Sequence, residues 1–169
     1  IDYLSNIASD FSSFANIGNP RMERVNLIAS VRSVVELFNM QENAQVAFTT
    51  TINEAYLMAD KTQLNRLFTN LIRNAIEAAG EEEAVVELHV DLRNDKAVVA
   101  VRDNGQGIPA ELQQKIFYPN FTTKTSGTGL GLAMCKSIVE QMKGEIWFTT
   151  EQQKGSTFFV ELPLLMSGE

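Results

Sequence analysis

Residues 61–79 carry the clearest helical signal in the chain. Asp60 followed three positions later by Gln63 is a capping-box pattern, and Gly80 supplies a stop signal. The apolar residues between them recur at steps of three and four and form one stripe: Leu64, Leu67, Phe68, Leu71, Ile72, Ala75 and Ile76. A helix with one apolar face has to bury it against a second layer, so the rest of the chain must supply that layer.

The segments after this helix have the pattern of strands. Apolar and polar residues alternate over 86–92, Asn94 and Asp95 mark a turn, and a second strand is expected over 97–102. We therefore predict an α+β two-layer sandwich, in which helices cover one face of a mixed, largely antiparallel sheet. Its other expected elements are helices over 27–41 and 129–142, at most one short helix near 110–117, and strands near 46–52, 145–150 and 156–162.

Composition excludes several classes of protein. With 169 residues, 44% of them hydrophobic and 21% charged, the chain has the make-up of one globular domain. With a net charge of −7, the chain lacks the basic character that is typical of nucleic-acid-binding proteins. A single cysteine and a single histidine exclude a disulfide framework and a site built from several thiolates or imidazoles. No apolar run reaches the roughly 18 residues that can span a bilayer.

The first 16 residues form a separate amphipathic segment. Its seam is two heptads long: Ile1, Leu4, Ala8, Phe11 and Ala15. A terminal helix lying on its own domain and the end of a coiled-coil or bundle helix both fit this pattern. Residues 18–20, Gly-Asn-Pro, break the helix, so we place a boundary between residues 1–19 and 20–169. Because the chain begins with Ile1 and not Met, we expect it to be part of a longer protein.

Two asparagines lie at the edge of the apolar stripe of the 61–79 helix. Asn70 and Asn74 are four positions apart, so they share one helix face. A carboxamide offers an oxygen to a hard cation and an NH₂ to a phosphate. The alternative is that both are polar residues flanking the core.

The sequence VRDNGQGIP places a carboxylate at the end of a strand. Asp103 keeps the phase of Val99 and Val101 and should point to the buried face, where it needs a hydrogen-bond donor. Gly105 and Gly107 allow the backbone to turn and to approach a ligand closely. A simple Asp-Asn-Gly turn is the alternative.

A long glycine-rich segment precedes the last helix. Gly127, Gly129 and Gly131 open that helix, where free N–H groups suit phosphate, and Lys124 stands just before them. The spacing matches neither a Walker A motif nor a dinucleotide fingerprint. A long loop inside a compact domain is usually functional.

Taken together and in this order, the motifs NLIRNAIEAA (70–79), DNGQGI (103–108), FTTK (121–124) and GTGLGLA (127–133) resemble those of a known family. They are similar to the catalytic, ATP-binding domain of sensor histidine kinases, in the superfamily shared with gyrase, the ninety-kilodalton heat-shock chaperone and the mismatch-repair ATPase. The finer pattern is most similar to the nitrogen-regulation type. The resemblance covers about residues 20–165 and implies a flexible ATP lid, with ATP and Mg²⁺ as cofactors.

The resemblance also assigns roles to single residues. Asp103 is expected to accept a hydrogen bond from the adenine amino group, with help from Ser156 through water. Gly105, Gly107 and Ile108 should shape the adenine pocket.

At the phosphate end, Asn74 is implied as the magnesium ligand and Asn70 as its helper. Lys124 should reach the terminal phosphates when the lid closes. The phosphate chain should be wrapped by five consecutive residues: Gly127, Thr128, Gly129, Leu130 and Gly131.

Two positions depart from the family pattern. Many relatives carry a basic residue where this chain has Glu77, so that phosphate contact could fall to Arg73 or Lys124. Hydrolytic members carry a Glu where this chain has Asn70, and its absence favours transfer to an acceptor over hydrolysis.

In this family the acceptor is a histidine on a two-helix dimerisation hairpin. The one histidine here, His89, lies on the polar face of an expected strand and in no such motif, so residues 1–19 would be the end of the hairpin and a linker. The implied partners are that hairpin, a response-regulator receiver domain and a second copy of the full-length protein, with no nucleic acid. The implied location is the cytoplasmic side of a membrane-associated parent.

Two other functions fit the same residues. A nucleotide-binding regulatory module would bind ATP without transferring its phosphoryl group. A serine kinase of the anti-sigma-factor type would act on a protein partner, but it would have no use for the helical seam at 1–15.

Overall fold

The computed structural model describes residues 2–16, 19–40, 44–119, 121–122 and 129–166. Among these residues no helix is both long and apolar enough to cross a membrane. The helices are α1 (Asp2–Asn16), α2 (Leu27–Asn39), α3 (Lys61–Ala78) and α4 (Gly131–Gln141), with a short 3₁₀ turn at Ala110–Leu112. The strands are β1 (Glu23–Asn26), β2 (Ala44–Thr49), β3 (Tyr56–Ala59), β4 (Ala84–Arg93), β5 (Lys96–Asp103), β6 (Glu145–Glu151) and β7 (Gly155–Pro163).

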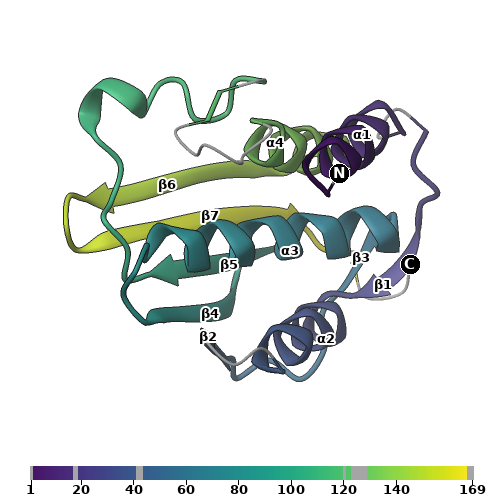
Figure 1. The fold of residues 1–169 in the computed structure, drawn as a ribbon. Coiled ribbons are helices and arrows are strands. Elements are labelled where there is room, and N and C mark those ends of the chain that lie inside the picture. The colour runs from purple at the N-terminus through teal and green to yellow at the C-terminus, as the bar shows by residue number, and fades with distance from the viewer. Residues whose placement is uncertain (1, 17–18, 41–43, 120, 123–128, 167–169) are drawn as a thin grey trace.

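Five of the strands form the main sheet, in the order β2-β4-β5-β7-β6. The β2–β4 pair is parallel, and the other three pairs are antiparallel. Helices α2, α3 and α4 lie on one face of this sheet (Figure 1). The predicted two-layer α+β fold with a mixed, largely antiparallel sheet is therefore confirmed.

The sheet face toward the helices is built of cross-strand rows. Strand register aligns Val90, Val99, Val160 and Ile146 in one row and Leu88, Val101, Phe158 and Phe148 in the next. Both rows join the apolar core. Phe117, from the long segment after β5, adds its ring to the second row at centroid distances of 6.1 Å from Phe148 and 6.3 Å from Phe158.

Helix α3 begins and ends where the sequence predicts. The Asp60 carboxylate accepts a hydrogen bond from the Gln63 backbone N–H at 3.1 Å, and Gly80 has a φ of 63°. Only half of the capping box forms, because the Gln63 side-chain oxygen is buried without a hydrogen-bond partner. The apolar stripe of the helix is buried except for Ile76, which is half-buried, and Phe68 is fully inaccessible. Truncating such a side chain to alanine costs about 3–5 kcal/mol.

Two strands escaped the sequence analysis. β1 and β3 pair with each other outside the main sheet, and each is only four residues long. Their burial comes from the tertiary packing around them, which a four-residue pattern does not reveal. The short helix expected near 110–117 is reduced to the three-residue 3₁₀ turn.

Candidate functional site

One row on the inner face of the sheet is polar. Next to the row of Leu88 and Val101, strand register brings Asp103, Ser156 and Thr150 side by side. Asp103 and Ser156 are 5% and 6% exposed, so this row is nearly as buried as the apolar rows. Burying polar groups costs free energy unless they form hydrogen bonds, with the protein or with a ligand. This end of the sheet is therefore a candidate site.

The Asp103 carboxylate is only half satisfied within the protein. Its Oδ1 accepts hydrogen bonds from the N–H groups of Gly105 at 2.9 Å and Ser156 at 3.1 Å. No described residue donates to Oδ2 or forms an ion pair with Asp103. Burial raises the pKa of this carboxyl, and the two N–H groups lower the pKa only in part. Oδ2 is thus an acceptor that fits a donor on a ligand.

Glycines hold the loop after Asp103 against its neighbours. A Cβ on Gly105 would lie 2.6 Å from the Cβ and carbonyl oxygen of Ala78, in the last turn of α3. A Cβ on Gly107, whose φ is 75°, would lie 2.5 Å from the carbonyl oxygen of Glu151. Both glycines are therefore needed by the fold, because the loop is wedged between α3 and the β6–β7 hairpin.

Hydrogen bonds fix the same loop on three sides. The Gln106 N–H donates to the carbonyl of Ala78 at 3.2 Å, and the Ile108 N–H donates to the Thr150 hydroxyl at 2.9 Å. The Asn104 side chain accepts from the N–H of Val85 at 2.9 Å, at the start of β4. The loop is accordingly preformed.

The two predicted asparagines stand on α3, whose last turn contacts this loop. Asn70 and Asn74 are both half-buried, as expected for the edge of the apolar stripe.

Helix α3 packs directly against α4, where the Cys135 thiol lies 3.8 Å from the carbonyl oxygen of Leu67. Cys135 is completely buried, and burial raises the pKa of its thiol to about 12, so it is a core residue.

The start of α4 differs from the 103–108 loop. Gly129 has a φ of 74°, Leu130 is buried, and a Cβ placed on Gly131 would meet no atom of the described residues within 4 Å. Among the described residues, no side chain caps the helix. The N–H groups of a helix start favour an anion. Lys124, Gly127 and Thr128 lie outside the described residues, as does most of the predicted lid.

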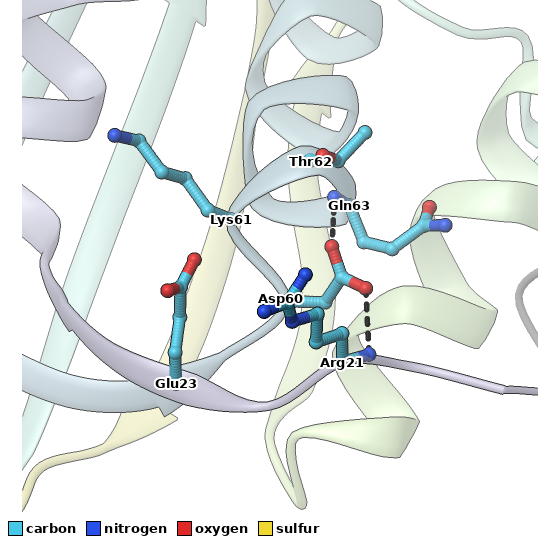
Figure 2. A pocket seen from close by; sticks show the side chains of 6 residues that line it. All are labelled: Arg21, Glu23, Asp60, Lys61, Thr62 and Gln63. Atoms are coloured by element: carbon cyan, nitrogen blue, oxygen red, sulfur yellow. Dashed lines mark hydrogen bonds between the residues drawn. The ribbon is translucent and has the colours of Figure 1, made fainter.

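A hollow of about 450 Å³ lies elsewhere, at the N-terminal end of α3 (Figure 2). Its lining is polar: Arg21, Glu23, Asp60, Lys61, Thr62 and Gln63. Both oxygens of the Asp60 carboxylate already accept hydrogen bonds there, from the backbone N–H groups of Gln63 and Arg21. Because Lys61 and Ala78 are about 25 Å apart along α3, this hollow is not part of the candidate site.

The geometry agrees with comparisons to known proteins. Residues 59–166 match the family described as "Histidine kinase-, DNA gyrase B-, and HSP90-like ATPase". The chain belongs to this family. Its membership supports ATP as the ligand of the site.

Two relatives match almost the whole chain. The sensor histidine kinase ZraS of Escherichia coli is 32% identical over 166 residues, which are 96% of this chain and 36% of ZraS. An NtrY-like protein of Rickettsia felis is 31% identical over 163 residues, which are 95% of this chain and 27% of that protein. The chain thus spans about a quarter to a third of the length of these relatives.

Solved structures confirm the fold. The catalytic domain of the histidine kinase ThkA superposes with a TM-score of 0.76 at 37% identity, covering 85% of this chain and 95% of that domain. ThkA in complex with the response regulator TrrA gives a TM-score of 0.79 at 30% identity, covering 99% of this chain and 50% of that one. Full-length ShkA in complex with AMPPNP gives 0.84 at 23% identity, a likeness of fold alone.

The structure brings the predicted adenine-side residues together and adds one. Asp103 and Ser156 are joined by a hydrogen bond, and Gly105, Gly107 and Ile108 form the loop beside them. Thr150 was not predicted as a site residue, although the alternation of β6 indicates its position. Thr150 keeps the phase of Ile146 and Phe148, so it lies on the inner face of the sheet.

Proposed function

We propose that this chain is the ATP-binding catalytic domain of a sensor histidine kinase, which transfers the γ-phosphoryl group of ATP to a histidine outside the chain. The observation that carries the proposal is the buried Asp103 carboxylate, whose Oδ2 has no donor among the described residues while a locked loop fixes Oδ1. That arrangement suits a ligand that presents a hydrogen-bond donor, as the amino group of adenine does.

The adenine end of the site is the polar row and its loop. Asp103 accepts from the adenine amino group, and the Ser156 hydroxyl assists directly or through a water molecule. Gly105, Gly107 and Ile108 shape the pocket around the base. A buried acceptor of this kind binds adenine and also discriminates against bases without the amino group.

The phosphate end comprises α3, the start of α4 and the lid. Asn74 holds Mg²⁺ with help from Asn70, and Lys124 reaches the terminal phosphates. The phosphate chain meets the N–H groups of Gly127, Thr128, Gly129, Leu130 and Gly131. No group of three or more acidic, histidine or cysteine side chains that could hold a metal occurs among the described residues, so the ion would rest on amide oxygens and on the nucleotide. When bound, Mg²⁺ neutralises phosphate charge.

The residue at position 70 favours phosphoryl transfer over ATP hydrolysis. Asn70 has no carboxylate to activate water, so this helix offers no general base at that position.

The one histidine of the chain lies away from the proposed site. His89 is exposed on the outer face of the sheet, and its Nδ1 lies 3.1 Å from the Thr49 hydroxyl. Asp103 lies on the inner face, so His89 is not placed to receive the phosphoryl group.

The rest of the assembly lies outside this chain. Residues 1–19 would be the end of the dimerisation hairpin and its linker, and residues 20–169 the ATP-binding domain. In α1, Leu4 and Phe11 are 72% and 67% exposed, which fits a helix that lacks its bundle partners. The full protein would be a membrane-associated homodimer with this chain on the cytoplasmic side, and its product would pass to a response-regulator receiver domain, the kind of partner that ThkA has in its complex.

The test is phosphoryl transfer from γ-labelled ATP. We expect the chain alone to bind Mg-ATP without labelling itself, because transfer needs an acceptor in line with the γ-phosphate. Adding the hairpin, in trans or by extending the chain upstream of Ile1, should give acid-labile, base-stable label on the hairpin histidine.

Three outcomes would contradict the proposal. ATP binding without transfer to any hairpin would favour a regulatory module. Acid-stable label on a partner serine would favour the anti-sigma-factor type. Stoichiometric label on the isolated chain that disappears in His89→Ala would place the acceptor inside this sequence.

A further inference from the structure

Thr150 lies at the centre of a small hydrogen-bond network beside Asp103. Its hydroxyl accepts from the Ile108 N–H at 2.9 Å and lies 2.8 Å from the Ser156 hydroxyl. A third neighbour, the carbonyl oxygen of Gly155, is 3.4 Å away. Thr150 therefore touches both halves of the adenine end, the loop through Ile108 and the polar row through Ser156.

The network allows two arrangements of the hydroxyl protons. Thr150 has one proton, and the bond from Ile108 already uses one of its lone pairs. That proton can go to the Gly155 carbonyl, with Ser156 donating to Thr150, or it can go to the Ser156 hydroxyl. An acceptor on the bound base selects the second arrangement, because the Ser156 proton then goes to the base. When Thr150 donates to Ser156, the proton of Ser156 must point away from Thr150.

We propose that Thr150 is a positioning residue that sets base selectivity by holding the Ser156 hydroxyl as a donor beside the Asp103 acceptor. The inference rests on the proposed function. A 6-aminopurine presents a donor at position 6 and an acceptor at N1, which matches this acceptor–donor pair. A 6-oxopurine has both polarities reversed and leaves two buried groups unmatched, which is the costly case.

The experiment measures the affinities of ATP and ITP for the 169-residue chain in the presence of Mg²⁺, by calorimetric titration. These nucleotides differ in the group at position 6 and in protonation at N1. Thr150→Val removes the hydroxyl at nearly constant shape, and Thr150→Ser keeps it. Thr149→Val is the matched control, because Thr149 is exposed on the outer face of the same strand.

In Thr150→Val the preference for ATP over ITP should narrow by roughly threefold to tenfold, the worth of one neutral hydrogen bond. Thr150→Ser and Thr149→Val should keep the preference of the parent chain. Ser156→Ala should narrow it as Thr150→Val does, and the double variant Thr150→Val/Ser156→Ala should narrow it no further, because Thr150 acts through Ser156.

Two results would overturn the inference while leaving the proposed function intact. One is an equal loss of ATP and ITP affinity in Thr150→Val, which would mean that Thr150 only supports the loop. The other is a double variant in which the preference for ATP over ITP narrows by the product of the two single-variant factors. That result would mean that the two hydroxyls act separately. Failure of the parent chain to bind ATP at all would overturn the proposed function itself.

Discussion

The two glycine-containing segments of the site are built in opposite ways. In the 103–108 loop, Gly105 is in contact with the protein itself, since an added Cβ would lie 2.6 Å from Ala78. At the start of α4, a Cβ added to Gly131 would meet no atom of the described part of the chain within 4 Å. The 103–108 loop is thus packed tightly against its neighbours, whereas the described residues leave space beside Gly131.

This difference separates the two tasks of the site. The proposed adenine end is shaped before a ligand arrives, by contacts to α3 and the β6–β7 hairpin. The proposed phosphate end would offer amide groups at a helix start that no described side chain caps, and it would take its remaining contacts from the ligand. A preformed half lowers the cost of binding, while the other half can respond to which nucleotide is bound.

The largest effect is expected at the preformed half. Gly105→Ala forces a methyl group into the backbone of Ala78, so it should lower the free energy of unfolding by about 1–3 kcal/mol and displace the N–H that holds Asp103. Urea unfolding and ATP titration measure the two effects. Unchanged stability would show that the loop is not wedged as described.

A smaller effect, confined to the metal-bound ligand, is expected at Asn74. Asn74→Ala should weaken binding of Mg-ATP by about tenfold, because the amide would contact the ion and phosphates directly. Adenosine, which lacks phosphates, should bind as before.

Asn65→Ala is the matched control on the same helix, since Asn65 lines a separate hollow between α2 and α3. An equal loss for adenosine and Mg-ATP in Asn74→Ala would make Asn74 a structural residue.

The smallest effect is expected at the open half. Gly131→Ala introduces no clash with the described residues and replaces glycine by a better helix former, so the free energy of unfolding should stay the same or rise by up to about 1 kcal/mol. ATP affinity should nevertheless fall by roughly threefold to tenfold, because the methyl group occupies space that the phosphate chain needs. An unchanged affinity would remove Gly131 from the phosphate site.

The sequence predicts most of the fold because long periodic segments indicate both their secondary structure and the face that they bury. The apolar stripe of α3 and the alternation of β4 and β5 each indicate a buried face, and Asp103 follows the phase of Val99 and Val101 into the interior. The buried position of the carboxylate was therefore predictable.

Contacts between distant segments were not predictable in the same way. The pairing of Thr150 with Ser156 depends on the register of the β6–β7 hairpin, and the contact of Gly105 with Ala78 depends on how the loop meets α3. The β1–β3 pair was missed because four residues are too few to show a period. The roles of Lys124, Gly127 and Thr128 stay predictions, since these residues lie outside the described part of the chain.

Asp103→Asn separates binding from folding more sharply than any other change. Asparagine keeps an oxygen for the N–H groups of Gly105 and Ser156, but it replaces the other carboxylate oxygen with an NH₂ donor, which opposes the donor of adenine.

The raised pKa of Asp103 determines in which direction Asp103→Asn should change the free energy of unfolding. The ionised carboxylate costs stability once the pH exceeds its ordinary pKa of 3.8, and the full cost is present above the raised pKa. The neutral amide removes this cost at pH 7. For the same reason, ATP affinity of the parent chain should fall as the pH drops through the raised pKa, where the acceptor is protonated.

The most direct measurement is calorimetric titration of ATP into the parent chain and into Asp103→Asn at pH 7, with urea unfolding of both proteins. The structure predicts that the parent binds ATP, that the variant loses at least tenfold in affinity, and that the variant is at least as stable as the parent. Equal ATP affinity in the two proteins, with both folded, would contradict the assignment of Asp103 as the adenine acceptor.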